Sequence, residues 1–87
     1  MKAIVTVIGV DKTGIIASVT TELARLGVNV EDISQTILQE YFVMLMMIES
    51  KKLDASEIGK SLEKLGEKVG VDIRVQNKEL FDAMHRI

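Results

Sequence analysis

Apolar residues in this chain switch twice from the spacing of a β-strand to the spacing of an α-helix. Residues 2–9 are rich in Ile, Val and Thr and are apolar on both faces, which is typical of an internal strand. Two stripes with helical spacing follow along the chain, Ile16, Val19, Leu23 and Leu26 in the first and Ile58, Leu62, Leu65 and Val69 in the second. This pattern predicts a chain in which strands and helices alternate.

Residue types that favour helix ends bracket these stripes. Gly27 and Gly70 lie just past the last apolar residue of each stripe, where a left-handed C-terminal cap is usual. The stretch D-A-S-E at 54–57 matches a capping box at the start of the second helix. Asn77 is placed to cap a last helix over residues 78–87, whose apolar residues lie on one side.

Three further segments have the character of strands. Residues 28 to about 40 are polar in their middle part, which favours a position at a sheet edge. Residues 42–50, "FVMLMMIES", are apolar on both faces and indicate a second central strand. Residues 71–76 alternate cleanly and predict a half-exposed strand.

The predicted order is β-α-β-β-α-β with an extra C-terminal helix, an α+β chain forming a single domain over residues 1–87. A split βαβ arrangement gives a four-stranded antiparallel sheet whose first and third strands are central. The two main helices then cover one face of the sheet and leave apolar side chains on the other. Because large apolar patches are unusual on monomers, we expect the final helix and a second subunit to cover that face.

Composition and charge argue against several function classes. The chain has no cysteine, which excludes disulfides and thiolate chemistry, and its net charge of −2 gives no basic footprint for nucleic acid. No apolar run is long enough for a membrane span and no signal peptide is evident, so we expect a cytoplasmic protein. The single histidine, His85, and the strand neighbours Glu31 and Asp32, which point to opposite faces, make a poor catalytic set. We therefore expect no enzyme, no metal and no cofactor, and we interpret Glu31 and Asp32 as a solvated pair at a bend.

The turn D-K-T-G, residues 11–14, is the best candidate for a binding site. A helix that starts at Gly14 or Ile15 presents free backbone N–H groups and a partial positive charge, which suit a carboxylate or phosphate. Asp11 can accept hydrogen bonds from an ammonium group, and Asn29 offers both donors and an acceptor. A free amino acid needs one group that binds its carboxylate and, beside it, another that binds its ammonium group.

The same residues also have a purely structural interpretation. Asp11 or Thr13 can cap the helix, Gly14 can serve a tight turn, and Asn29 can serve the turn into the next strand. The residues alone leave both interpretations open.

The stretch "VIGVDKTGIIASVTTELARLGVNVEDIS" resembles the opening of an ACT domain, the small-molecule regulatory module of amino-acid metabolism. The shared pattern is D-x-x-G-[IV] at the first strand-to-helix turn and G-V-N-[IV] at the entry to the second strand. The resemblance covers the whole chain, and its ending "FDAMHRI" is similar to a group of free-standing ACT-domain proteins related to the glycine-cleavage repressor type.

The resemblance implies a ferredoxin-like fold and dimers that hold ligands at or near the subunit interface. In ACT domains that regulate serine biosynthesis, the loop and the second strand hold the effector. Gly14 and Asn29 match binding positions of those domains, whereas Asp11 replaces an asparagine and Gly9 replaces a frequent histidine. Serine specificity therefore does not carry over. The resemblance predicts a homodimeric regulatory domain that binds an amino acid, and the alternative is a protein–protein interaction module that binds no metabolite.

Overall fold

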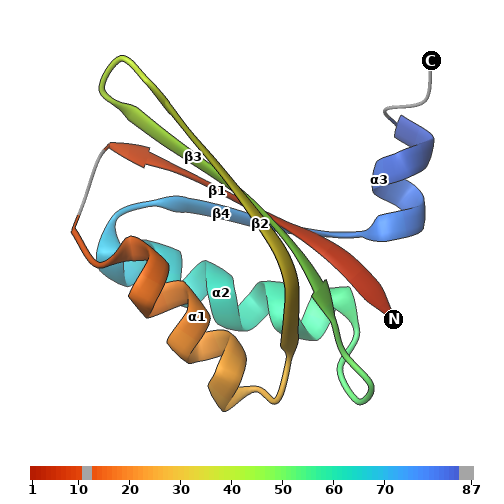
Figure 1. Cartoon of the computed structure of the whole chain (residues 1–87). Coiled ribbons are helices and arrows are strands. Elements are labelled where there is room, and N and C mark those ends of the chain that lie inside the picture. Colours follow the sequence, from red (N-terminus) through yellow and green to blue (C-terminus); the bar gives the residue numbers. More distant parts are fainter. Residues whose placement is uncertain (11–12, 85–87) are drawn as a thin grey trace.

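The computed structural model of the chain describes residues 1–10 and 13–84, and these residues form four strands and three helices (Figure 1). The elements follow the order predicted from the sequence, and their bounds are β1 (Lys2–Val10), α1 (Ile15–Arg25), β2 (Asn29–Leu38), β3 (Tyr41–Glu49), α2 (Ala55–Val69), β4 (Asp72–Asn77) and α3 (Lys78–Met84).

The strands form one antiparallel sheet in the order β2-β3-β1-β4. The prediction that the first and third strands are central is confirmed, as is the edge position of the second. The register pairs Val5 of β1 with Met46 of β3 on one side and with Val75 of β4 on the other. The pairing of β2 with β3 shifts between Val30 and Asp32, so the bend expected near this point is a β-bulge.

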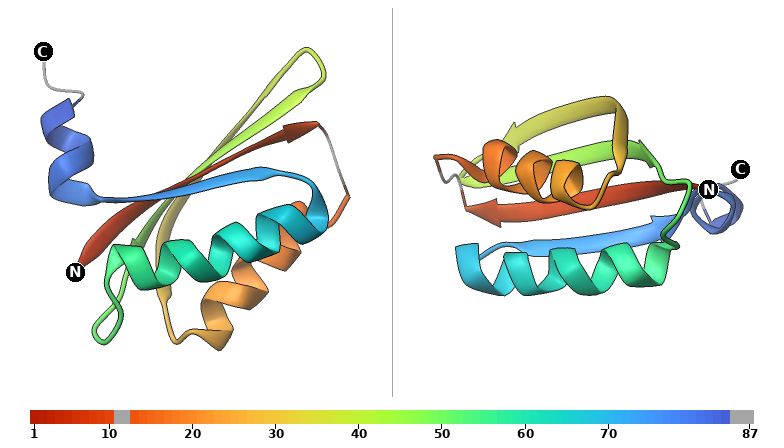
Figure 2. Two further views of the ribbon diagram at one scale, coloured as in Figure 1. Left: turned by 180° about the vertical axis from the view of Figure 1, so that it is seen from behind. Right: turned by 90° about the horizontal axis from the view of Figure 1, so that it is seen from below.

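Helices α1 and α2 cover the same face of the sheet, with α1 on the side of β2 and β3 and α2 along β4 (Figure 2). The buried core lies between these two layers. Its members come from every second residue of the central strands and from one stripe of each helix, and they include Ala3, Val5, Val7, Val19, Leu23, Met44, Met46, Ile48, Ile58 and Leu62. This pattern is the physical reason for the fold, because burial of these side chains supplies most of the free energy of folding.

The predicted caps close both main helices. Gly27 has φ 73°, the N–H of Gly27 donates to Ala24 O at 3.0 Å, and the N–H of Val28 donates to Leu23 O at 2.9 Å. These two bonds form a Schellman motif. At the start of α2, Asp54 and Glu57 exchange side-chain and backbone hydrogen bonds in a complete capping box.

Helix α3 packs over one end of the sheet on the side away from α1 and α2 (Figures 1 and 2). Asn77 caps it as predicted, because its Oδ1 accepts the N–H of Glu79 at 2.9 Å. The helix ends at Met84, and the rest of the predicted segment lies outside the described residues, as does His85. The short helix covers only part of the second face of the sheet.

Helices α1 and α2 are joined by the carboxylate of Glu22. Arg25 donates to it through Nε at 2.9 Å and through a second guanidinium nitrogen at 2.5 Å, and the hydroxyl of Ser61 in α2 donates to it as well. The hydrogen bonds from Arg25 and then Ser61 lower the pKa of Glu22 from its ordinary value of 4.5 to about 2. A pKa that is depressed in the folded state adds stability above pH 4.5, and this stability is lost as the pH falls toward 2.

Glu22→Gln is therefore expected to lower the free energy of unfolding by about 1 kcal/mol at pH 7, since partial solvent exposure weakens the pair. The difference between variant and wild type should disappear near pH 2, where the carboxyl of the wild type is half protonated or more. Urea unfolding at several pH values measures both quantities. Glu67→Gln on the exposed surface of α2 is the control and should change the stability by less than about 0.5 kcal/mol. An equal loss at pH 7 and at pH 2 would contradict the assignment.

Candidate functional site

The site predicted from the sequence begins at the first turn of α1. Gly14 is the N-cap residue of this helix and has φ 86°, a left-handed conformation that favours glycine. Its carbonyl accepts the N–H of Ser18 at 2.9 Å, and this bond starts the helix. Since the N-cap is a glycine, Thr13 is not the capping residue, and that structural interpretation is wrong for Thr13.

The start of α1 differs from the start of α2 in its polar surroundings. No side chain caps α1 among the described residues, and its first turn contains no acidic residue, whereas α2 has a complete capping box. The first N–H groups of a helix have no acceptor within the helix, and no side chain among residues 1–10 and 13–84 caps those of α1. The side chain of Ile15 is buried in the core and holds this end of the helix in place.

Gly9 is the position at which related domains often have a histidine. A Cβ atom at Gly9 would lie 2.6 Å from Cγ1 of Val71 and 3.2 Å from its Cβ. A side chain at Gly9 would therefore require Val71, directly before β4, to shift. The departure from the family pattern has a structural reason in this chain.

Asn29 begins β2, directly after the Schellman motif that ends α1, and its side chain is exposed. It lines a surface pocket of about 500 Å³ together with Arg25, Leu26, Gly27, Glu49, Ser50, Lys51 and Lys52. Three basic side chains thus gather around Asn29, with a single carboxylate, Glu49. This basic cluster was not predicted from the sequence, although the run S-K-K after β3 is its signal.

The structure does not bring the predicted site residues together within one chain. Gly14 and Asn29 lie at opposite ends of α1 (Figure 1). Eleven residues of α-helix span about 16 Å, which is far more than the distance between the carboxylate and ammonium groups of an amino acid. Asp11 lies outside the described residues, so its role stays a prediction.

The other surface features lie apart from the predicted binding residues. A groove of about 930 Å³ between α2 and β4 contains none of the predicted site residues. Over residues 1–10 and 13–84, no group of His, Cys, Asp or Glu side chains is arranged to hold a metal ion. Within the same part of the chain, none of the helices has both the length and the apolar character needed to cross a membrane.

Comparison with known proteins gives matches over nearly all of the chain. The model of the ACT domain family matches residues 2–76. A UPF0237 protein of Streptococcus mutans is 47% identical over the full length of both chains. A UPF0237 protein of Methanococcus maripaludis is 48% identical over 97% of this chain and 96% of its own.

Solved structures give the same result. An ACT domain protein from Streptococcus pneumoniae is 44% identical, covers 98% of both chains and superposes with a TM-score of 0.86. A putative glycine cleavage system transcriptional repressor shares the fold with a TM-score of 0.78 at 21% identity, over 86% of this chain and 44% of its own. The regulatory subunit of aspartate kinase from Thermus thermophilus is 28% identical, with a TM-score of 0.69 over 86% of this chain and 50% of its own. The ferredoxin-like fold and the family predicted from the D-x-x-G and G-V-N motifs are therefore confirmed, and the chain belongs to the ACT domain family.

Proposed function

We propose that this chain is a regulatory domain that senses a free amino acid at a site shared between two copies. ACT domains are regulatory domains that sense ligands, and the matching proteins include the regulatory subunit of an aspartate kinase. The observation that supports the proposal is the start of α1, where no described side chain caps the backbone N–H groups that follow Gly14. This is the position at which the family pattern holds its ligand.

In the proposed site, the ligand carboxylate accepts hydrogen bonds from the N–H groups at Gly14 and Ile15. Asp11 receives the ammonium group. Asn29 fixes the orientation of the ligand and comes from the second copy, since within one chain it lies about 16 Å away along α1.

A two-fold axis at the β2 edge of the sheet accommodates this arrangement. Helix α1 and strand β2 flank the same edge of the domain (Figure 2). Two copies related across that edge run in opposite directions, so each brings its Asn29 toward the start of α1 in the other. The basic residues Lys51 and Lys52 accompany Asn29 and offset the negative charge of Asp11.

In this proposal the chain is a homodimer without catalytic activity of its own. Ligand binding therefore acts by changing how strongly the two copies associate. A ligand that contacts both copies binds the paired state more tightly than the separated state, and it shifts the equilibrium by that difference in affinity. We place this sensor in the cytoplasm, as the sequence analysis predicts.

Thermal unfolding in the presence of each standard amino acid tests the proposal. A cognate ligand at ten times its Kd is expected to add about 1.4 kcal/mol to the free energy of unfolding. For a domain of this size the midpoint of unfolding should rise by roughly 6–11 °C. Amino acids that do not bind should leave the midpoint unchanged.

Variants of the site residues connect such a shift to the proposed geometry. Asn29→Ala and Asp11→Ala should abolish the ligand shift while leaving the unliganded midpoint close to that of the wild type. Ser56→Ala, which removes an exposed hydroxyl from α2 and not from the β2 edge, is the control and should keep the full shift. A shift that survives Asn29→Ala would place the ligand elsewhere.

The second candidate function is a protein–protein interaction module that binds no metabolite. The observation that favours it is the exposed apolar side chains on the face of the sheet opposite α1 and α2. This function predicts no thermal shift with any amino acid.

A further inference from the structure

A groove of about 540 Å³ runs between α1 and α2 on the side of these helices that faces solvent. The half-buried side chains of Leu26 and Leu65 supply its apolar surface. The basic side chains that line it are Arg25 from α1 and Lys60, Lys64 and Lys68 from α2. All four basic residues are exposed, so the groove combines an apolar floor with a basic rim.

The carboxylates that line this groove are already engaged within the chain. Glu22 accepts hydrogen bonds from Arg25 and Ser61, so the charge of Arg25 is largely balanced. Glu57 completes the capping box at the start of α2. None of the three lysines forms an ion pair with another residue in the described part of the chain. The rim of the groove therefore presents three positive charges that have no ion-pair partner among residues 1–10 and 13–84.

The three lysines form a single row, called here the lysine row, because they are spaced by four residues along α2. Each step of four residues advances about 6 Å along a helix, so the row extends over about 12 Å. Like charges at this spacing repel one another and weaken a helix. Glu63 and Glu67 form a second row of like charges on the side of α2 that faces β4. The charges of α2 are thus sorted by side and not alternated in the way that best stabilises a helix.

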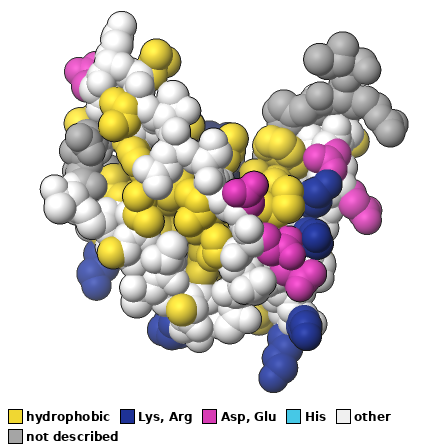
Figure 3. All heavy atoms as spheres, in the orientation of Figure 1, with side chains coloured by type: hydrophobic (Ala, Val, Ile, Leu, Met, Phe, Trp, Pro, Cys, Tyr) yellow, Lys and Arg dark blue, Asp and Glu magenta, His cyan; other side chains and the backbone are white. Residues whose placement is uncertain are grey.

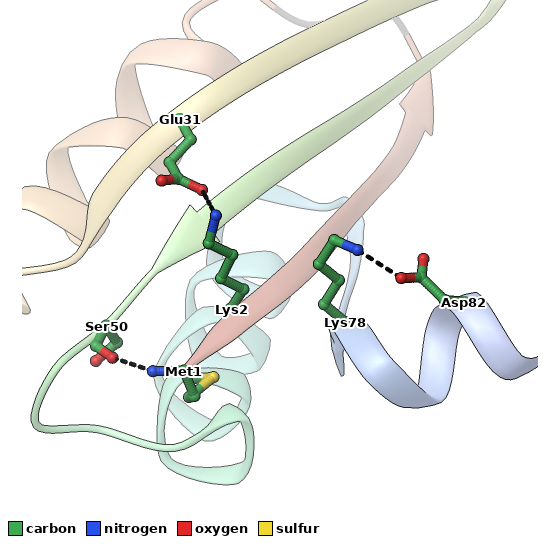
Figure 4. A network of polar contacts seen from close by, with 6 residues as sticks. All are labelled: Met1, Lys2, Glu31, Ser50, Lys78 and Asp82. Carbon is green, nitrogen blue, oxygen red and sulfur yellow. Dashed lines mark hydrogen bonds and ion pairs between the residues drawn. The ribbon is translucent and has the colours of Figure 1, made fainter.

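Basic side chains on the other side of the sheet differ from the lysine row because they have acidic partners. Lys2 pairs with Glu31 at 3.2 Å and Lys78 pairs with Asp82 at 2.5 Å (Figure 4). Figure 3 shows basic and acidic side chains side by side near α3, and further basic side chains along the lower side of the molecule, where α1 and α2 lie in Figure 1. The unpaired positive charge of the described residues is therefore concentrated on the side of the helices.

We propose that this groove binds an acidic amphipathic helix of a partner protein. A helix that lies along α2 can present carboxylates at intervals of four residues, which is the spacing of the lysine row. Its apolar stripe then covers Leu26 and Leu65, as in other complexes in which a helix lies in a groove. The contact involves neither Gly14 nor Asn29, and it stands whether or not an amino acid binds.

A nucleic acid or an anionic membrane fits this groove less well than an acidic helix does. The chain has a net charge of −2, so its surface outside the lysine row is acidic on balance and repels an extended polyanion. The described residues that line the groove include no aromatic side chain on which a base could stack. An acidic amphipathic helix uses both the basic rim and the apolar floor.

Fluorescence anisotropy with a labelled peptide and the full chain tests the proposal. The probe is a peptide of about 14 residues, held helical by a side-chain cross-link, in which pairs of glutamate alternate with pairs of leucine to give an acidic and an apolar stripe. We expect saturable binding of one peptide per chain that weakens as salt is added. Replacing the glutamates of the peptide by glutamine, or its leucines by alanine, should each weaken binding about tenfold or more.

Variants of the chain locate the contact. Lys64→Glu changes the centre of the lysine row and should weaken peptide binding about tenfold or more, while the exposed position leaves the fold intact. Lys78→Glu makes the same change of charge at the start of α3, on the other side of the sheet, and should leave the affinity unchanged. Asn29→Ala should also leave it unchanged, so failure of the ligand site is distinguishable from failure of this contact.

The opposite results would overturn the proposal. They are no binding of the peptide, equal affinity for the glutamate and glutamine peptides or for the leucine and alanine peptides, and equal weakening by Lys64→Glu and Lys78→Glu. Tighter binding to a single-stranded oligothymidine, or to vesicles that contain phosphatidylglycerol, than to the acidic peptide would also overturn it and would assign the groove to nucleic acid or to a membrane surface.

Discussion

Replacing Met44 with alanine is expected to lower the free energy of unfolding by about 2–5 kcal/mol. Met44 is fully buried on central strand β3 and belongs to the core between the sheet and the two helices. Truncation removes buried apolar atoms and leaves a cavity that the surrounding core fills only partly. Since domains of this kind are stable by about 5–15 kcal/mol, the loss is a large share of the total. Urea unfolding measures it.

The adjacent residue provides the matched control. Leu45 is also on β3 but projects to the face of the sheet opposite α1 and α2 and is 40% exposed. Leu45→Ala is expected to lower the free energy of unfolding by less than about 1 kcal/mol when measured on dilute, dissociated protein. Equal losses for the two variants would contradict the assignment of the core to one face of the sheet.

Gly66→Ala in α2 is expected to lower the free energy of unfolding by about 2 kcal/mol, because the cost of overpacking, up to about 3 kcal/mol, exceeds the gain of about 1 kcal/mol from helix propensity. A Cβ atom at Gly66 would lie 2.7 Å from the backbone oxygen of Val71 and 3.4 Å from a side-chain carbon of Ile73. The oxygen is backbone and cannot rotate away, so α2 must shift from β4. Thermal or urea unfolding measures the loss.

Gly59→Ala in the same helix is the matched control and should have the opposite sign. The nearest atom to a Cβ at Gly59 is Cβ of Val75, at 3.7 Å, which is ordinary van der Waals contact. The gain from helix propensity then remains, and the free energy of unfolding should rise by up to about 1 kcal/mol. If both variants were stabilising, the close packing of α2 on Val71 would be refuted.

Much of the fold could be predicted from local patterns. The central position of β1 and β3 followed from apolar residues on both faces, and the edge position of β2 followed from its polar middle. Gly27, Asp54 and Asn77 were assigned their capping roles because capping depends on residues within one turn of the helix. Predictions of this kind succeed when the cause lies in consecutive residues.

The candidate site could be predicted only in part. The motifs indicated Gly14 and Asn29 as site residues. They did not indicate that α1 separates these two residues by about 16 Å. The basic cluster of Arg25, Lys51 and Lys52 escaped prediction because its members come from two distant segments. The length of α1 is therefore the reason that the proposed site needs a second copy.

The order of the elements, their caps and the faces that are buried follow from the amino-acid sequence, because hydrophobic period and capping act between residues close in the chain. The ACT domain family was indicated separately, by the resemblance of the D-x-x-G and G-V-N motifs. Other features depend on the packing of the elements: the close approach of Gly9 and Gly66 to Val71, and the separation of about 16 Å along α1 between Gly14 and Asn29. Each of these outcomes depends on the distance between atoms of different elements. That distance is fixed only when strands pair and helices pack, so no local pattern contains it.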